Sequence, residues 1–189
     1  MSDSLIDAVH HGDLAAVQRL TSQETLDVRD EDGRSALMWA ARLGRPALVR
    51  WLLSAGAAVD ARDARDYTAL FHACHDPDAD RGHPEAVALL LQAGADKEAC
   101  IGFGVRPLMY AAGNGEAAVV QVLLQAGADP LARNEVGRTA LMMVKDRDYV
   151  DVINLLHEAE AGLEAGGCGS RNAPDQQVIT FLKPPARGQ

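Results

Sequence analysis

We predict an all-α solenoid, a stack of short helix-turn-helix units, and three observations support this prediction. A pattern of residues recurs about every 33 positions along most of the 189-residue chain. Each copy contains two apolar runs, and each run is too short to form a stable helix alone. Alanine and leucine dominate the apolar residues, and aromatic residues make up only 4% of the chain, a composition that favours helices. Because no unit can bury its apolar face alone, the units are expected to stack.

The first marker of the repeat is the start of the first helix in each copy. The segments read GRSALMWAA at 33–41, DYTALFHAC at 66–74, GVRPLMYAA at 104–112 and GRTALMM at 137–143. Their shared leucines are Leu37, Leu70, Leu108 and Leu141, spaced by 33, 38 and 33 residues. The small residues that end the first three segments let neighbouring helices approach closely. The residues that open the segments, Gly33, Asp66, Gly104 and Gly137, are expected to have positive φ in a tight turn.

The second marker lies at the end of the second helix. LLQAGAD occurs at 90–96 and again at 123–129, and LLSAGA at 52–57 is the earlier copy. The leucine pairs are expected to fill the space between stacked units. The glycines Gly56, Gly94 and Gly127 are expected to end each helix with a left-handed residue.

A 33-residue period with a helix start close to T-P-L-H resembles the ankyrin repeat. The resemblance covers roughly residues 5–160 and implies stacked helix pairs with short finger hairpins. It divides the ankyrin-repeat domain 1–160 into an N-terminal cap at 1–29 and repeats at about 30–62, 63–100, 101–133 and 134–160. Within the cap, Leu5–Val9 matches a first helix, and Gly12–Val17 with Leu20 matches a second. The T-A-L-M form of the helix start is similar to divergent bacterial or protist ankyrin proteins.

The 38-residue spacing places an insertion in the second repeat. Residues 75–81 replace the two-residue link Arg42-Leu43 of the first repeat and are expected to protrude between two helices. Asp76, Asp78 and Asp80 have the 1-3-5 spacing of a calcium loop, but Arg81 and Val87 stand where the loop needs glycine and glutamate. The histidines His72, His75 and His83 could instead bind a transition metal. A solvated acidic loop is the simpler interpretation, so we expect no metal site.

The last repeat and the residues after it depart from the pattern. Val144-Lys145 replaces the small pair, as expected where a terminal unit faces solvent. Residues 161–189 are expected to form a flexible C-terminal tail, because Gly162–Gly169 contains four glycines. A β-prone run, Val178–Leu182, lies within the tail. This run could dock on the repeats, on a partner or on a second copy, or the tail could be disordered without a role, and we favour docking on a partner.

Composition and motifs argue against several classes of protein. The net charge of −9 does not suit a nucleic-acid-binding protein. The longest apolar run, Ala86–Leu91, is far shorter than the ~18 residues of a membrane span. The first residues do not resemble a signal peptide. The three widely spaced cysteines suit neither disulfides nor zinc, so we expect a reducing, cytoplasmic location.

No catalytic pattern is complete. The chain contains no P-loop, no H-E-x-x-H and no G-x-S-x-G. Gly102-Phe103-Gly104 begins like a dinucleotide-binding motif, but Pro107 replaces the third glycine. Cys74-His75-Asp76 contains the residue types of a triad, but adjacent residues cannot converge on one reacting atom. We therefore expect neither an enzyme nor a cofactor.

The resemblance to ankyrin repeats implies that binding occurs on the concave face, formed by the fingers and the exposed parts of the first helices. The residues selected on this basis as partner-binding are Arg34, Trp39, Arg42, Arg65, Tyr67, His72, His75, Phe103, Tyr110, Asn114 and Arg138. Further positions on this face are Glu31, Asp32, Val105, Glu135 and Arg147. Arg42 and Tyr67 are expected at surface positions, where substitution leaves stability nearly unchanged.

Trp39, His72 and Tyr110 occupy one equivalent position in three successive repeats and are expected to line up as an aromatic ridge. This ridge could contact a partner, since Trp and Tyr are favoured interface anchors, or it could pack against the fingers. The resulting prediction is a monomeric, cytoplasmic protein-binding module. One alternative is a dedicated inhibitor of a partner enzyme, like an immunity protein or an antitoxin. Another alternative is a metal-binding protein that uses residues 75–81.

Overall fold

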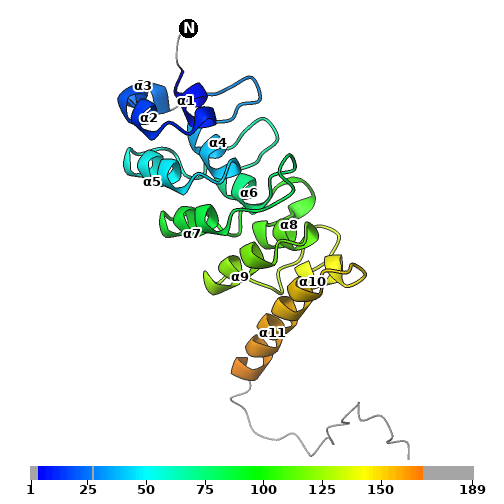
Figure 1. The fold of residues 1–189 in the computed structure, drawn as a ribbon. Helices are drawn as coiled ribbons and strands as arrows, with labels where there is room; N and C mark the ends of the chain where they lie inside the picture. The colour runs from blue at the N-terminus through cyan, green and yellow to red at the C-terminus, as the bar shows by residue number, and fades with distance from the viewer. Residues whose placement is uncertain (1–3, 27, 168–189) are drawn as a thin grey trace, which may run out of the picture.

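The helices form two columns. A computed structural model describes residues 4–26 and 28–167. The first helices of the pairs are α1 (Leu5–His11), α4 (Ala36–Arg42), α6 (Ala69–Cys74), α8 (Pro107–Gly113) and α10 (Ala140–Val144). The second helices are α2 (Leu14–Leu20), α5 (Pro46–Ser54), α7 (Pro84–Gln92), α9 (Ala117–Gln125) and α11 (Val150–Gly167). The chain crosses from one column to the other in each pair and descends the stack pair by pair (Figure 1).

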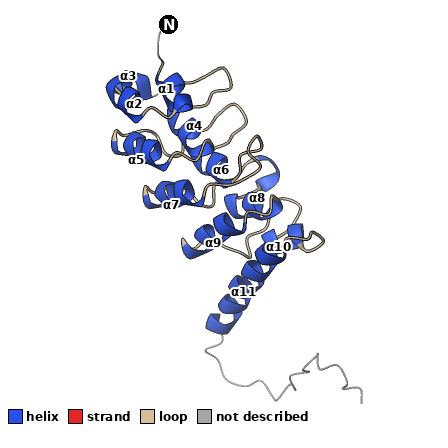
Figure 2. Cartoon of the chain, in the orientation of Figure 1, coloured by secondary structure: helices blue, strands red, loops and turns tan. Residues whose placement is uncertain are grey.

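The architecture confirms an all-α solenoid. The described residues form helices and contain no strand, only isolated bridges (Figure 2). Two short elements were not predicted. They are α3 (Gln23–Leu26) in the cap and the 3-10 turn η1 (Gly102–Gly104) before α8. The first helices of the pairs form the inner column, and the second helices form the outer column. Each inner helix packs on the inner helix before it, as α6 does on α4 and α8 does on α6.

The residues at the helix starts explain why the helices begin where they do. The Ser35 Oγ accepts a hydrogen bond from the Met38 backbone N–H at 3.3 Å, and the Thr139 Oγ1 accepts one from Met142 at 3.3 Å. Both bonds satisfy an N–H that has no partner within its helix. Proline occupies the first turn of α5, α7 and α8, where its missing N–H costs nothing.

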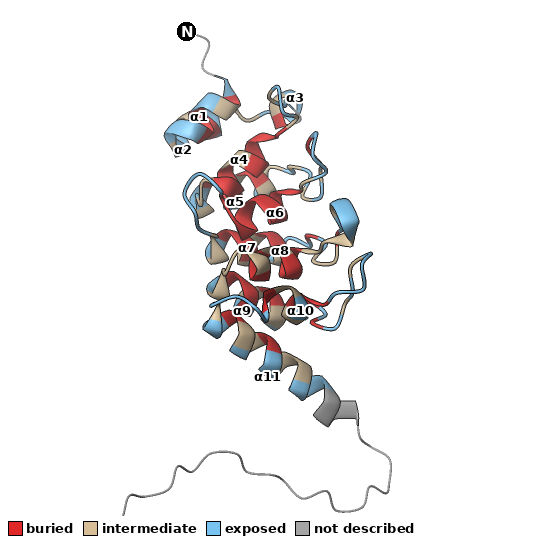
Figure 3. Ribbon diagram, turned by 90° about the vertical axis from the view of Figure 1, so that its right-hand side faces the viewer, coloured by how far each residue is buried: buried red, intermediate tan, exposed pale blue. Residues whose placement is uncertain are grey.

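The repeated apolar residues form the core between the columns, which Figure 3 shows as a continuous buried zone. Most of the expected leucines are buried: Leu37, Leu70 and Leu108 in the inner helices, and Leu52, Leu90 and Leu123 in the outer ones. The second leucine of each pair and the leucine of the last repeat are half-buried: Leu53, Leu91, Leu124 and Leu141. The small pairs that end the inner helices are fully buried. Lys145, where the last repeat departs from this pattern, is exposed, as expected at the end of the stack.

A finger precedes each of α4, α6, α8 and α10 and confirms the predicted turns. The four fingers are residues 30–34, 63–67, 101–105 and 134–138. In each, the first N–H donates to the last carbonyl oxygen at 3.0 Å. The predicted positive φ angles are present, at 79° for Gly33, 64° for Asp66, 69° for Gly104 and 76° for Gly137. Asp30, Asp63 and Asn134 each also accept two backbone N–H groups of their own finger, which fixes the loop.

Arginine side chains join successive fingers. The Arg29 Nη1 donates to the carbonyl oxygens of Gly33 and Arg62, at 2.8 and 2.6 Å. Arg62 repeats this pattern 33 residues later, toward Asp66 and Cys100, at 3.2 and 2.9 Å.

Cys100 replaces the arginine at the next step of this series. Arg106, which follows the third finger and does not precede it as Cys100 does, instead donates to the carbonyl oxygen of Arg133 at 2.8 Å. The contact between the third and fourth fingers is therefore kept with a different side chain.

The C-terminal boundary of the helical region differs from the prediction. A flexible tail was expected from residue 161, but α11 continues to Gly167. The helix-favouring residues of the segment AGLEA at 161–165 outweigh its single glycine. The β-prone run Val178–Leu182 lies outside the described residues. Among the helices of residues 4–26 and 28–167, none is both long enough and apolar enough to cross a membrane.

Candidate functional site

A cavity of about 290 Å³ opens where the first two fingers meet the inner helices. Seven of the eleven residues predicted to bind a partner line it. The lining residues are Arg34, Arg42, Arg65, Tyr67, His72, His75, Pro77, Asp78 and Tyr110. They come from three successive repeats and from the insertion. The cavity therefore exists only in the stacked array, because no single repeat supplies its walls.

Trp39 holds two of the cavity's arginines in place. The guanidinium carbons of Arg34 and Arg42 lie 4.9 and 5.2 Å from the centroid of the Trp39 ring, within the range of cation–π contact. The Trp39 Nε1 donates to Asp30 Oδ2 at 2.7 Å, which fixes the ring against the first finger. Trp39 is half-buried and does not line the cavity itself.

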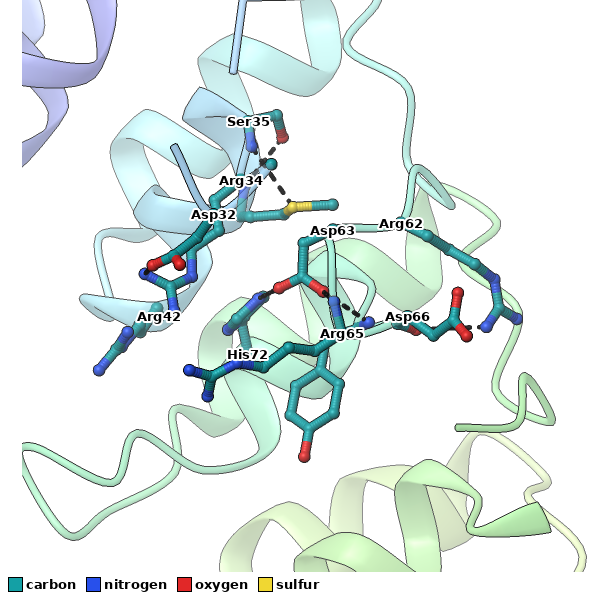
Figure 4. Close-up of polar contacts among 12 residues, drawn as sticks. Asp32, Arg34, Ser35, Arg42, Arg62, Asp63, Arg65, Asp66 and His72 are labelled. Carbon is teal, nitrogen blue, oxygen red and sulfur yellow. Dashed lines mark hydrogen bonds and ion pairs between the residues drawn. The ribbon is translucent and has the colours of Figure 1, made fainter. Parts of the chain in front are cut away.

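His72 is held by the second finger in the equivalent way. Its Nε2 lies 2.9 Å from Oδ2 of Asp63, and the other oxygen of Asp63 accepts two N–H groups of the finger. Burial would raise the pKa of the Asp63 carboxyl, but these hydrogen bonds hold it below its usual range. The carboxylate therefore accepts from a His72 N–H. Figure 4 shows this contact beside the side chains of Arg34, Arg42 and Arg65.

Burial lowers the pKa of His72, and the charges of Arg34 and Arg42 lower it further, while Asp63 opposes this shift. The imidazole is therefore neutral at pH 7. The charge on the cavity wall comes from its arginines and from Asp78, and not from His72.

Tyr67 and Tyr110 form the aromatic wall of the cavity. Their ring centroids lie 5.7 Å apart in an edge-on arrangement, and Tyr67 lies at the same distance from His72. Burial raises the pKa of Tyr110 well above its usual value, with a further rise from Tyr67, so its phenol stays protonated.

The predicted ridge of Trp39, His72 and Tyr110 is therefore not continuous. His72 is buried and the other two residues are half-buried. Tyr67 lies between His72 and Tyr110, whereas two arginines cover Trp39. Of the two alternatives, packing against the fingers describes Trp39 and His72, whereas Tyr110 also lines the cavity.

The insertion at 75–81 corrects one prediction. Its tip, residues 77–81, is exposed, as expected of a protrusion. Its base is not solvated, because Asp76 is only 4% exposed and accepts a hydrogen bond from the Arg42 Nε at 2.9 Å. The Arg42 guanidinium also pairs with Asp78. Arg42 is 8% exposed, so the expectation that it occupies a free surface position is wrong.

The three residues of the segment Cys74-His75-Asp76 point to different partners. The Cys74 thiol is fully buried, and burial raises its pKa, with a smaller contribution from Glu116. The His75 Nδ1 lies 2.8 Å from Glu116 Oε1, and Asp76 pairs with Arg42. Within the described part of the chain, no group of three or more His, Cys, Asp or Glu side chains is arranged to hold a metal ion.

The other predicted residues lie away from the cavity. Phe103 is 75% exposed at the tip of the third finger, with a positive φ of 62°. Arg138 is exposed on the fourth finger. The Asn114 side chain donates to the Tyr110 carbonyl oxygen at 2.8 Å and so caps the end of α8. The structure does not bring these three residues into the same site.

Sequence reasoning missed the carboxylates that position the cavity side chains. Asp30 and Asp63 are 33 residues apart, and each bonds to the residue nine positions further on. This repeated spacing of nine residues could have been recognised in the sequence. Asp76 and Glu116 offered no such signal, because each pairs with a residue 34 or 41 positions away.

Comparisons with known proteins agree with this architecture. A family model for ankyrin repeats in three copies matches residues 5–99 and 78–166. The chain is 38% identical over 161 residues to human ankyrin repeat domain-containing protein 63. This match covers 79% of this chain and 41% of the human protein. It is 39% identical over 139 residues to the mouse protein of the same name. This match covers 69% of this chain and 34% of the mouse protein.

A third relative matches a shorter segment. A stretch of 75 residues is 43% identical to M-phase phosphoprotein 8 of Rattus norvegicus, covering 38% of this chain and 9% of that protein. The chain thus spans about two fifths or less of the length of these relatives. The bacterial or protist type and the number of repeats stay predictions. The matches to two segments that together cover most of the chain, and to relatives along more than two thirds of it, show that this protein belongs to the ankyrin-repeat family.

Proposed function

We propose that this protein is a non-enzymatic module that binds a partner protein on its concave face. Ankyrin repeats are generally protein-interaction modules, and fold alone does not specify the partner. The observation that supports this proposal most is the cavity itself. Side chains from three repeats and from the insertion line one cavity on the side of the fingers.

The chemistry of the cavity suits protein recognition. Tyrosine and arginine are the residue types most often found as energetic anchors of interfaces. Here Tyr67 and Tyr110 supply apolar area with a polar end, and Arg65 supplies an exposed charge. The side chains beneath them are held by hydrogen bonds and stacking, so little ordering is needed when a partner binds.

The cavity is also small. Its volume of about 290 Å³ lies at the lower end of the ~300–1,000 Å³ typical of small-molecule sites. It can take one or two side chains of a partner.

The test is a double substitution, Arg65→Ala with Tyr67→Ala, measured by capture of the partner from an extract of the source cells. Arg42 is unsuitable for this test, because its buried ion pair would confuse loss of binding with loss of stability. Arg50→Ala is the matched control, since Arg50 is exposed on α5, in the outer column.

We expect the double variant to lose the partner that the wild-type chain and Arg50→Ala retain. It is expected to stay folded at a somewhat lower urea midpoint, because Tyr67 is half-buried and its ring packs against Phe71, His72 and Tyr110. Retention of the partner by a folded double variant would contradict the proposal.

We also propose a cytoplasmic monomer that binds neither nucleic acid nor membranes. The net charge of −9 supports the absence of nucleic-acid binding, and the free, exposed Cys100 suits a reducing compartment. Light scattering of the purified chain tests the monomeric state, and a dimer at micromolar concentration would contradict it.

A further inference from the structure

We infer that the cavity receives an acidic side chain of the partner, a carboxylate or a phosphate monoester, and that Arg65 is the residue that binds it. This inference rests on the proposed function, because it names the chemical group that the same cavity takes.

Among the residues that the structure describes, Arg65 is the arginine of the cavity that forms no ion pair. Its side chain is exposed at the cavity mouth. Among the described residues it takes part in none of the ion pairs, whereas Arg34 and Arg42 are both paired. Its backbone is fixed, since the Arg65 N–H donates to Asp63 Oδ1 at 2.9 Å. A guanidinium on a fixed loop is well suited to bind a carboxylate or phosphate with two parallel hydrogen bonds.

Arg34 supplies a second guanidinium to the cavity wall. The residue is 8% exposed, and among the described residues it forms one ion pair, between its Nη1 and Asp32 Oδ2 at 2.9 Å. Its Nε has no acceptor in the described part of the chain, but this atom is covered by protein and does not face the cavity. Arg34 therefore contributes positive charge to the wall, and Arg65 remains the group that can contact the anion.

The carboxylates around the cavity are already paired. Asp76 and Asp78 both pair with the single guanidinium of Arg42. Asp63 is occupied by His72 and by the N–H groups of its own finger. Asp32 pairs with Arg34. Within the described part of the chain, Arg65 is therefore the guanidinium of the cavity that no carboxylate pairs with, and the preference for an anion rests on Arg65.

The tyrosines complete the site. Tyr110 stays protonated through burial, so its phenol can donate to an acidic group. The aromatic rings of Tyr67 and Tyr110 can pack against the aliphatic part of the same side chain. A glutamate, an aspartate or a phosphorylated serine matches this combination of donors and apolar wall.

The experiment uses a displayed library of random 12-residue peptides, selected against the full chain. The variants are Arg65→Glu and, as a matched charge reversal on the outer column, Arg50→Glu. Peptides selected by the wild-type chain and by Arg50→Glu are expected to share an acidic residue at one fixed position. Arg65→Glu is expected to abolish that preference.

Synthetic peptides then identify the anion. Replacing the shared Asp or Glu with Asn or Gln is expected to raise Kd about tenfold or more, as for other charge-assisted anchors. Replacing it with phosphoserine separates the two sources. Tighter binding assigns a phosphate monoester, and weaker binding assigns a carboxylate.

The results that overturn the inference differ from those that overturn the proposed function. Selected peptides that carry no acidic residue, or a lysine, at the fixed position, and that still require Tyr67, would contradict only the acidic anchor. Peptides whose binding is unchanged by Arg65→Glu and by Tyr67→Ala would contradict both.

Discussion

The Arg42 Nε donates a hydrogen bond to Oδ1 of Asp76 at 2.9 Å, although the two residues are 34 positions apart. The bond joins the end of α4 to the insertion of the next repeat. It also explains how a charged residue is tolerated at a buried position, because the guanidinium meets a carboxylate there. The insertion is thus part of the packing of the array and forms one wall of the cavity.

Removing Asp76 is expected to destabilise the protein more than removing Asp78, its exposed neighbour. Asp76→Ala leaves the buried Arg42 guanidinium without its buried partner, at a cost of about 3 kcal/mol. The Asp78 side chain is 83% exposed, so Asp78→Ala is expected to cost less than about 1 kcal/mol. Urea unfolding measures both changes. Equal costs would show that the buried pair does not stabilise the fold.

Stability is expected to fall as the pH drops from about 7 toward 5. Burial lowers the pKa of His72, as do Arg34 and Arg42, so protons bind more readily to the unfolded chain. The stability that depends on a neutral His72 is therefore fully present above the ordinary histidine pKa of about 6.5. It is lost as the pH falls toward the lowered pKa of His72 in the folded chain. Burial, followed by Arg81, lowers the pKa of His83, which adds to the same slope.

The variant His72→Gln isolates this contribution, because an amide can still donate to Asp63 but does not titrate. Its free energy of unfolding is expected to depend less on pH than that of the wild-type chain, in urea titrations at pH 7.5 and 5.5. A His72→Gln slope equal to that of the wild-type chain would refute this account.

A double-mutant cycle tests the contact between the third and fourth fingers. Arg106→Ala removes the hydrogen bond to the Arg133 carbonyl oxygen, at a cost of about 1 kcal/mol, and a partly exposed ion pair with Glu98 that contributes less. Cys100→Arg restores the arginine series begun by Arg29 and Arg62, so it is expected to recover the part of the loss that comes from the hydrogen bond. Cys100→Ala is the matched control and should recover nothing. If both substitutions at Cys100 have the same effect in urea unfolding, the series has no energetic role.

Two glycine substitutions are expected to have opposite outcomes. A methyl group at Gly82 would overlap the Cys74 carbonyl oxygen and lie 2.6 Å from Val119 Cγ2. Gly82→Ala is therefore expected to destabilise the fold by about 2 kcal/mol. A methyl group at Gly113 meets nothing within 4 Å, so Gly113→Ala is expected to be neutral or to stabilise by up to about 1 kcal/mol. Similar melting temperatures for the two variants would contradict this packing.

The repeat period predicted the fold because each of its signals is local. Each finger turn needs one residue with positive φ, and glycine and aspartate tolerate this conformation. Gly33 and Asp66 occupy this place in the first two fingers and have positive φ. The same register placed Arg65, Tyr67 and His72 on one side of the stack. The cavity therefore contains most of the residues selected from the sequence.

What the sequence could not predict depends on contacts between repeats. The burial of Arg42 follows from Asp76, whose partner lies one repeat away with no fixed spacing. The aromatic cluster forms because the Tyr67 ring turns toward Tyr110 of the next repeat. The extension of α11 past residue 160 reflects helix-favouring residues among glycines, a balance that composition alone does not settle.

Photo-crosslinking tests the concave-face account most directly, because it reports where the partner lies. A photoreactive amino acid replaces one exposed alanine at a time. Ala64 and Ala79 lie on the second finger and at the tip of the insertion, whereas Ala47 and Ala118 lie on α5 and α9 in the outer column. We predict that the partner captured by the wild-type chain crosslinks from positions 64 and 79 and not from 47 or 118. Crosslinks from the outer helices alone would contradict binding at the cavity.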